Sequence, residues 1–232
     1  MTEAGSAKVP VPFVRSLRTA RSVAIAGIVS AVTLTLTLHL YRSAFPFDEM
    51  LAATQQPSAE AIAQGRLALS LMPYVGISFI WFMGAVNYNL GRADNRLFTT
   101  VFLASGVLFV GVSFVAGAVG AAELAALSEG LDRTPQERIV PGLAVNELLI
   151  NYGARMAAVF CLALSTFGRL RRILPSWLSW LGTATGVFLL LVPYGVPHVQ
   201  YVFPAWIAVL SVYLFVTNPG EESLPGEESL AA

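Results

Sequence analysis

Three polar side chains inside an otherwise apolar stretch have the types and the spacing to do chemistry. Glu147, Asn151 and Arg155 lie four positions apart, so in a helix they share one face. Arg155 is also the midpoint of an apolar run over residues 143–167. A charged residue at the centre of a membrane-spanning helix costs about 2.5 to 3.5 kcal/mol. We therefore expect Arg155 to have a partner inside the protein.

The direction of the side chains indicates where that partner is. Helical side chains lean toward the N-terminus of their helix, so Arg155 is expected to reach toward Asn151 and the level of Glu147. Glu123 ends the preceding apolar stretch, which runs in the opposite direction, and should lean back to a similar depth. The sequence therefore predicts a polar chamber, with two histidines near its mouth. The predicted lining is Arg155, Asn151, Glu147, Tyr152 and Glu123, and the histidines are His39 and His198.

Two interpretations of this chamber remain open at the level of sequence. In the first, Arg155 is an internal clamp that satisfies backbone carbonyls and acids and so holds the helices together. In the second, the chamber binds an anionic solute or lipid. Ionisable residues within a membrane are candidates for functional sites by default, and the pattern is compatible with both interpretations.

Other kinds of site find little support in the sequence. Cys161 is the only cysteine, which excludes a disulfide framework and a cysteine-based metal site. Two histidines are too few for a zinc triad, and a bis-histidine haem site is the weaker alternative to interfacial polar tips. The sequence contains no phosphate-binding loop, metalloprotease helix, nucleophile elbow or dinucleotide-binding turn. We expect no cofactor and no metal, and the absence of these motifs leans against an enzyme but leaves the question of enzymatic activity open.

Composition sets the environment of the elements that carry these residues. Hydrophobic residues make up 56% of the 232 positions and charged residues 12%, whereas soluble domains are about 25% charged. The formal net charge of zero gives no reason to expect nucleic acid as a partner. Six stretches have the roughly 20 apolar residues that cross a bilayer. These stretches are 22–41, 67–90, 97–122, 143–167, 177–196 and 199–217.

The sequence thus predicts an all-α, polytopic transmembrane bundle of six spans. Only a tight turn with Pro193 and Pro197 separates the last two stretches, so a re-entrant hairpin is the alternative there. Residues 1–21 form a basic cytoplasmic arm ahead of the bundle over 22–217. Residues 218–232 form an acidic tail with a repeated Pro-Gly-Glu-Glu-Ser-Leu segment, which is too polar to bury a core and is expected to be disordered.

Basic residues predict the orientation, because they accumulate on the cytoplasmic side. One side of the six-span arrangement carries Lys8, Arg15, Arg18, Arg21, Arg92, Arg96, Arg169, Arg171 and Arg172. The other side carries only Arg42, Arg66, Arg133 and Arg138. Both ends of the chain are therefore expected in the cytoplasm, and the protein in the inner (plasma) membrane of a bacterium as a multi-pass protein.

Local signals predict where some helices begin and how they pack. Thr134 and Glu137 form a capping box that begins a helix before Pro141 bends the chain. Gly182 and Gly186 form a GxxxG motif that favours close packing of helices within the chain. Thr33 and Thr37 should supply hydrogen bonds between helices.

Two segments resemble a known group of proteins. Residues 171–182 read Arg-Arg-Ile-Leu-Pro-Ser-Trp-Leu-Ser-Trp-Leu-Gly and residues 203–214 read Phe-Pro-Ala-Trp-Ile-Ala-Val-Leu-Ser-Val-Tyr-Leu. They resemble the last two spans of a family of six-helix integral membrane proteins from bacteria, in which a basic segment and Leu-Pro-x-Trp-Leu-x-Trp-Leu-Gly precede span five. The resemblance implies six spans. It implies no activity and no site residues, because that family has no assigned function.

The sequence favours a non-enzymatic accessory or scaffold subunit of a membrane assembly, with envelope lipid handling as one setting. The alternative is a small transporter or a protein that binds lipid or anions in the chamber around Arg155, and a membrane enzyme is least favoured. The expected partners are the lipid bilayer, other membrane protein subunits and anionic lipids.

Overall fold

The computed structural model describes residues 14–44, 58–90, 96–129, 134–172, 174–192, 196 and 198–217, and all regular structure in these residues is helical. The α-helices are α1 (Val14–Ala44), α2 (Ala59–Leu90), α3 (Arg96–Ser128), α4 (Pro135–Asn146), α5 (Ala154–Leu170), α6 (Ser176–Leu191) and α7 (Val202–Thr217). A π-helical segment, η1 (Glu147–Gly153), joins α4 to α5, and a short 3₁₀ segment, η2 (Val199–Tyr201), precedes α7. The predicted tail and the first residues of the predicted arm lie outside the described residues.

Five of these helical stretches are long and apolar enough to cross a membrane. They are Arg21–Ser43, Ala59–Asn87, Leu97–Ser128, Ile139–Leu170 and Val199–Thr217. The apolar helix α6 has 16 residues, or about 24 Å at 1.5 Å per residue, against about 30 Å of hydrocarbon. The prediction of an all-helical bundle with the composition of a membrane protein is therefore confirmed.

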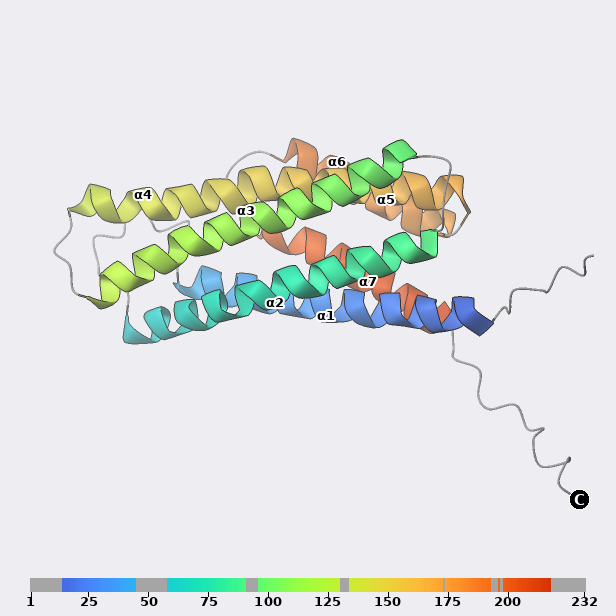
Figure 1. Ribbon diagram of the computed structural model, residues 1–232. Coiled ribbons are helices and arrows are strands. Elements are labelled where there is room, and N and C mark those ends of the chain that lie inside the picture. Colours follow the sequence, from blue (N-terminus) through green and yellow to red (C-terminus); the bar gives the residue numbers. More distant parts are fainter. Residues whose placement is uncertain are drawn as a thin grey trace, which may run out of the picture.

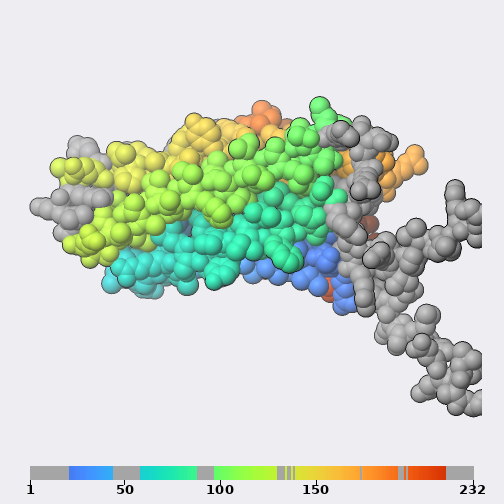
Figure 2. Space-filling model, in the orientation of Figure 1, coloured from blue at the N-terminus to red at the C-terminus, as the bar shows by residue number. Residues whose placement is uncertain are grey.

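The helices form a ring in chain order. Helix α1 packs against α2, α2 against α3, α3 against α5, and α5 against α6, while α7 closes the ring against α1. The long axes of the helices follow a common direction (Figure 1), and α2, α3 and α4 lie side by side along one face (Figure 2). Each helix therefore turns one side toward a shared axis.

The two ends of this bundle differ in charge. The basic end, where α1 begins and α5 and α7 end (Figure 1), carries Arg21, Arg169, Arg171 and Arg172. The acidic end, where α2 and α4 begin, carries Glu60, Glu123, Glu129 and Glu137 together with Arg42 and Arg66. Arginines also pack on rings at the basic end, with Arg21 over Phe215 at 5.5 Å and Arg169 over Trp180 at 4.9 Å from the ring centroids.

The helix that carries Arg155 runs without a break from α4 through η1 to the end of α5. It begins at the predicted capping box, in which the backbone amide of Thr134 donates to Glu137 Oε2 at 2.9 Å and the amide of Glu137 donates to Thr134 Oγ1 at 3.4 Å. It also continues past Pro141, which lies inside α4. The predicted span over 143–167 is thus the middle of a longer helix.

Small residues bring neighbouring helices close together. A Cβ atom at Gly182 would lie 2.0 Å from Ser165 Oγ, and one at Gly186 would lie 2.9 Å from the backbone oxygen of Ala158. The motif therefore packs α6 against α5 within the chain, as the sequence predicts. Between α1 and α2, Thr33 Oγ1 and Ser78 Oγ share a hydrogen bond of 3.2 Å.

Candidate functional site

Arg155 lies directly after the π-helical segment η1 and bonds back to it. Its Nη1 donates to the backbone oxygen of Asn151 at 3.2 Å and, at 3.5 Å, to that of Ile150. In a π-helix the backbone bonds run from residue i to residue i+5 instead of i+4, and such segments occur often at functional sites. The guanidinium therefore caps carbonyl groups in the turn where the helix changes its hydrogen-bond pattern.

Glu147 and Asn151 lie on the same turn and bond to each other, with Asn151 Nδ2 donating to Glu147 Oε1. The structure thus brings together the three residues that the four-residue spacing singled out. In the part of the chain that is described, the acceptors of Arg155 are carbonyl oxygens of its own helix. Glu147 and Glu123, the predicted acidic partners, are not among them.

The other predicted residues of the chamber lie elsewhere. Glu123 is buried in α3, with 5% of its surface exposed, and interacts electrostatically with Tyr41 of α1. The Tyr41 hydroxyl also lies against Gly120, where a Cβ would approach it to 3.0 Å. Tyr152, in contrast, is 57% exposed. The predicted chamber residues are therefore divided between the π-helical turn, a buried contact with α1 and the outer surface.

Neither histidine lies inside the bundle. His39 and His198 are both exposed, and the ring of His198 stacks on Tyr201 with centroids 6.1 Å apart. Within the described residues, no group of three or more His, Cys, Asp or Glu side chains is arranged to hold a metal ion.

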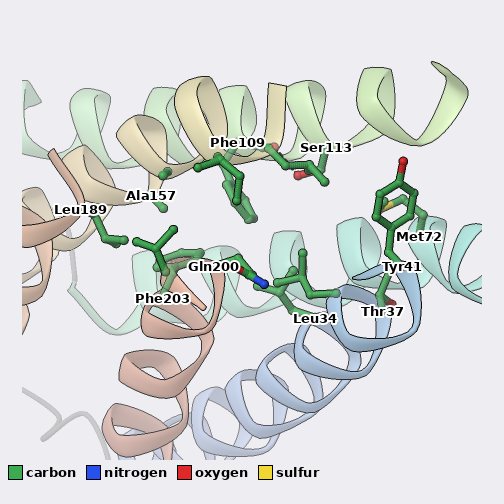
Figure 3. Close-up of a pocket in the computed structure, with 15 residues that line it drawn as sticks. Leu34, Thr37, Tyr41, Met72, Phe109, Ser113, Ala157, Leu189, Gln200 and Phe203 are labelled. Atoms are coloured by element: carbon green, nitrogen blue, oxygen red, sulfur yellow. Dashed lines mark hydrogen bonds between the residues drawn. The ribbon is translucent and has the colours of Figure 1, made fainter. Parts of the chain in front are cut away.

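A cavity at the axis of the ring is the feature that sequence reasoning missed. It has a volume of about 40 Å³ and is lined by residues of all the α-helices except α4, and by η1 and η2. Leu149 and Ile150 of η1 form part of its wall, so the turn held by Arg155 borders the cavity. Figure 3 shows lining side chains that point into this space from different helices, among them Leu34, Phe109, Ala157, Leu189 and Phe203.

Four polar side chains interrupt the apolar wall of the cavity: Thr37, Tyr41, Ser113 and Gln200. Ser113 Oγ donates to the backbone oxygen of Phe109 at 2.8 Å. Thr37 is 1% exposed, and neither its Oγ1 nor the buried Nε2 of Gln200 finds a hydrogen-bond partner in the described part of the chain. The prediction that Thr33 and Thr37 both link helices thus holds for Thr33 alone.

An aromatic core adjoins the cavity on the side of the basic end. It consists of Phe79, Phe82, Phe102, Phe109, Phe160 and Phe203, whose neighbouring ring centroids are 4.7 to 6.5 Å apart. Phe109 and Phe203 also line the cavity. Rings at these separations gain edge-to-face and offset contacts in addition to the burial of apolar surface.

Comparison with protein-family models, with curated proteins and with solved structures found no match to this chain. The site is therefore interpreted from its own geometry. That geometry has two parts: a π-helical turn whose carbonyls are capped by Arg155, and a small polar cavity beside that turn.

Proposed function

We propose that the chain crosses the inner membrane of a bacterium six times, with both ends in the cytoplasm. The separation of charge between the basic end and the acidic end supports this orientation, because arginine and lysine accumulate on the cytoplasmic side. The apolar character of α6 and the resemblance of residues 171–214 to six-span proteins support the sixth span. Reporter fusions after residues 92 and 172 should be cytoplasmic and fusions at 55 and 133 external. An external signal after residue 172 would contradict the six-span arrangement.

For this bundle we propose the role of a non-enzymatic accessory or scaffold subunit of a membrane assembly. The observation that carries this proposal is the bonding of Arg155 to the carbonyls of Ile150 and Asn151. A guanidinium whose Nη1 already donates to carbonyls of its own helix stabilises that helical turn and has fewer donors left for an anionic ligand. A clamped helix around a packed aromatic core gives the rigid body that a scaffold needs.

The experiment compares wild type, Arg155→Ala and Arg155→Lys after purification in mild detergent, by native mass spectrometry and thermal unfolding. A clamp in a scaffold predicts that a stoichiometric protein partner co-purifies with wild type and that Arg155→Ala unfolds at lower temperature. Arg155→Lys should recover part of the loss, because an ammonium still donates to carbonyl oxygens. Unchanged stability with loss of a bound anionic lipid would instead make Arg155 a ligand-binding residue.

The central cavity favours a second function, that of a membrane protein that binds a small solute. It is supported by two residues of the cavity wall, Thr37 and Gln200, each of which carries a buried polar atom with no hydrogen-bond partner among the described residues. This function differs from the predicted chamber around Arg155, because the lining residues of the cavity include no Arg, Lys, His, Asp or Glu.

A further inference from the structure

We propose that the cavity at the axis of the ring is a binding site for a small, uncharged molecule that offers an oxygen atom as hydrogen-bond acceptor to Gln200 and Thr37. The molecule is water or a neutral solute of a few heavy atoms, such as a short alcohol. This proposal rests on the second proposed function, the binding of a small solute in the cavity, and does not depend on whether the bundle serves as a scaffold.

The hydrogen-bonding groups of the lining specify the chemistry of the ligand. A buried polar group without a partner destabilises a protein by about 1 to 3 kcal/mol, so such groups in native structures are normally paired. The amide nitrogen of Gln200 can only donate, and the hydroxyl of Thr37 can donate and accept. Oxygen atoms of small molecules in the cavity would satisfy these groups, whereas a hydrocarbon would satisfy neither.

The charge of the lining excludes ions. Among the described residues that line the wall, Tyr41 is the only ionisable side chain, and it interacts electrostatically with the buried Glu123. Moving an ion into such a space costs several kcal/mol unless an opposite charge is present. A neutral molecule avoids this cost.

The volume restricts the size of the ligand. A cavity needs about 10 to 15 Å³ to hold one water molecule, and this one has about 40 Å³. Benzene, by comparison, binds in an engineered cavity of about 150 Å³. A few waters or one small solute therefore fit, and a lipid headgroup does not.

The test is hydroxyl-radical footprinting of the full chain in lipid nanodiscs, read by mass spectrometry. Water inside the protein generates radicals at buried sites, so buried residues that touch it are oxidised. Met72 lines the cavity and is 6% exposed, whereas Met83 is 3% exposed and packs in the hydrophobic core outside the cavity lining. We expect Met72 to be oxidised severalfold faster than Met83, and Phe109 faster than Phe102.

Two variants close the site in different ways. Ala157 lines the cavity at 1% exposure, so Ala157→Leu should fill the space and lower the rate of Met72 to that of Met83. Thr37→Val keeps the shape of the side chain and removes only the hydroxyl, so it tests the proposal even where the larger leucine impairs folding, and it should also lower the Met72 rate. Ala122→Leu, at an exposed position, is the matched control and should leave the rate unchanged.

The two sources of the oxygen atom are distinguished by adding 2-propanol as a probe. Because 2-propanol also scavenges hydroxyl radicals, the readout is the ratio of the Met72 rate to the Met83 rate in the same sample. A lower ratio in wild type, with no change in Thr37→Val, would show that a small alcohol displaces water from the site. A high ratio that 2-propanol does not alter would assign the site to water. Equal rates for Met72 and Met83 in wild type, with no small molecule retained in native mass spectra, would overturn the proposal.

Discussion

The aromatic core and the central cavity lie next to each other on the axis of the same ring, but they differ in the side chains that face the axis. In the core, Phe79, Phe160 and their neighbours from α2, α3, α5 and α7 fill the space between these helices with rings that contact one another. The cavity shares Phe109 and Phe203 with the core, but its wall also includes small or polar side chains such as Ala157 and Thr37. The comparison indicates that these side chains leave space on the axis that rings fill in the core.

The two regions also differ in their contribution to the stability of the fold. Each buried ring contributes a large apolar surface and many dispersion contacts, so the core should carry much of the stability. Thr37 and Gln200 place polar atoms where a bundle optimised only for packing would place apolar ones. Buried polar atoms that lower the stability of the bundle make the cavity, and not the core, the candidate for a binding function.

The largest effect on stability is expected from a substitution that opens a void in the aromatic core. Phe160 is fully buried and stacks with four other rings of the core. We expect Phe160→Ala to lower the free energy of unfolding by about 3 to 5 kcal/mol, measured by equilibrium unfolding in detergent. Phe188→Ala, at a position 45% exposed, is the control and should change little. A loss below that of the control would show that the core is not the stabilising region.

A substitution of Arg155 tests the helical turn beside the cavity, because the turn that Arg155 caps forms part of the cavity wall. Arg155→Ala removes a charged donor from two carbonyls, which should cost about 1.5 to 3 kcal/mol. In a double-mutant cycle, the coupling between Arg155→Ala and Glu147→Gln should stay below about 0.5 kcal/mol. A coupling of several kcal/mol would restore the acidic partner that the sequence predicts.

The smallest expected effects on stability come from substitutions of two glycines, one in a close helix contact and one on an open surface. Gly182→Ala places a methyl group against Ser165 Oγ and the indole of Trp206 and should destabilise by about 1 to 3 kcal/mol. Gly84 has no atom within 4 Å of an added Cβ, so Gly84→Ala should stabilise α2 by about 0.5 to 1 kcal/mol. Thermal unfolding of the two variants side by side checks the opposite signs.

Much of the fold could be predicted because its signals are local. Apolar length predicts the long helices, the capping box at Thr134 predicts where α4 begins, and Gly182 with Gly186 predicts a close helix contact. Whether α6 spans the membrane is harder to predict. Its 16 residues are fewer than a full span needs, while the flanking residues are also apolar.

The site could be predicted only in part. The position of Arg155 in an apolar run predicts that its charge needs partners, but the π-helical turn whose carbonyls accept its hydrogen bonds has no pattern in the sequence. The same is true of the cavity, whose lining comes from residues between Leu34 and Phe203. Thr37 and Gln200 are far apart in the sequence, so only the packed ring reveals that their polar atoms face one space.

The most direct test of the account is a high-resolution experimental structure of the protein in lipid nanodiscs. We expect density in the central cavity for small molecules within about 3.2 Å of Thr37 Oγ1 and of Gln200 Nε2. We also expect the guanidinium of Arg155 to remain on the carbonyls of its own helix. An empty cavity, with Thr37 and Gln200 turned to bond with the protein itself, would contradict the account.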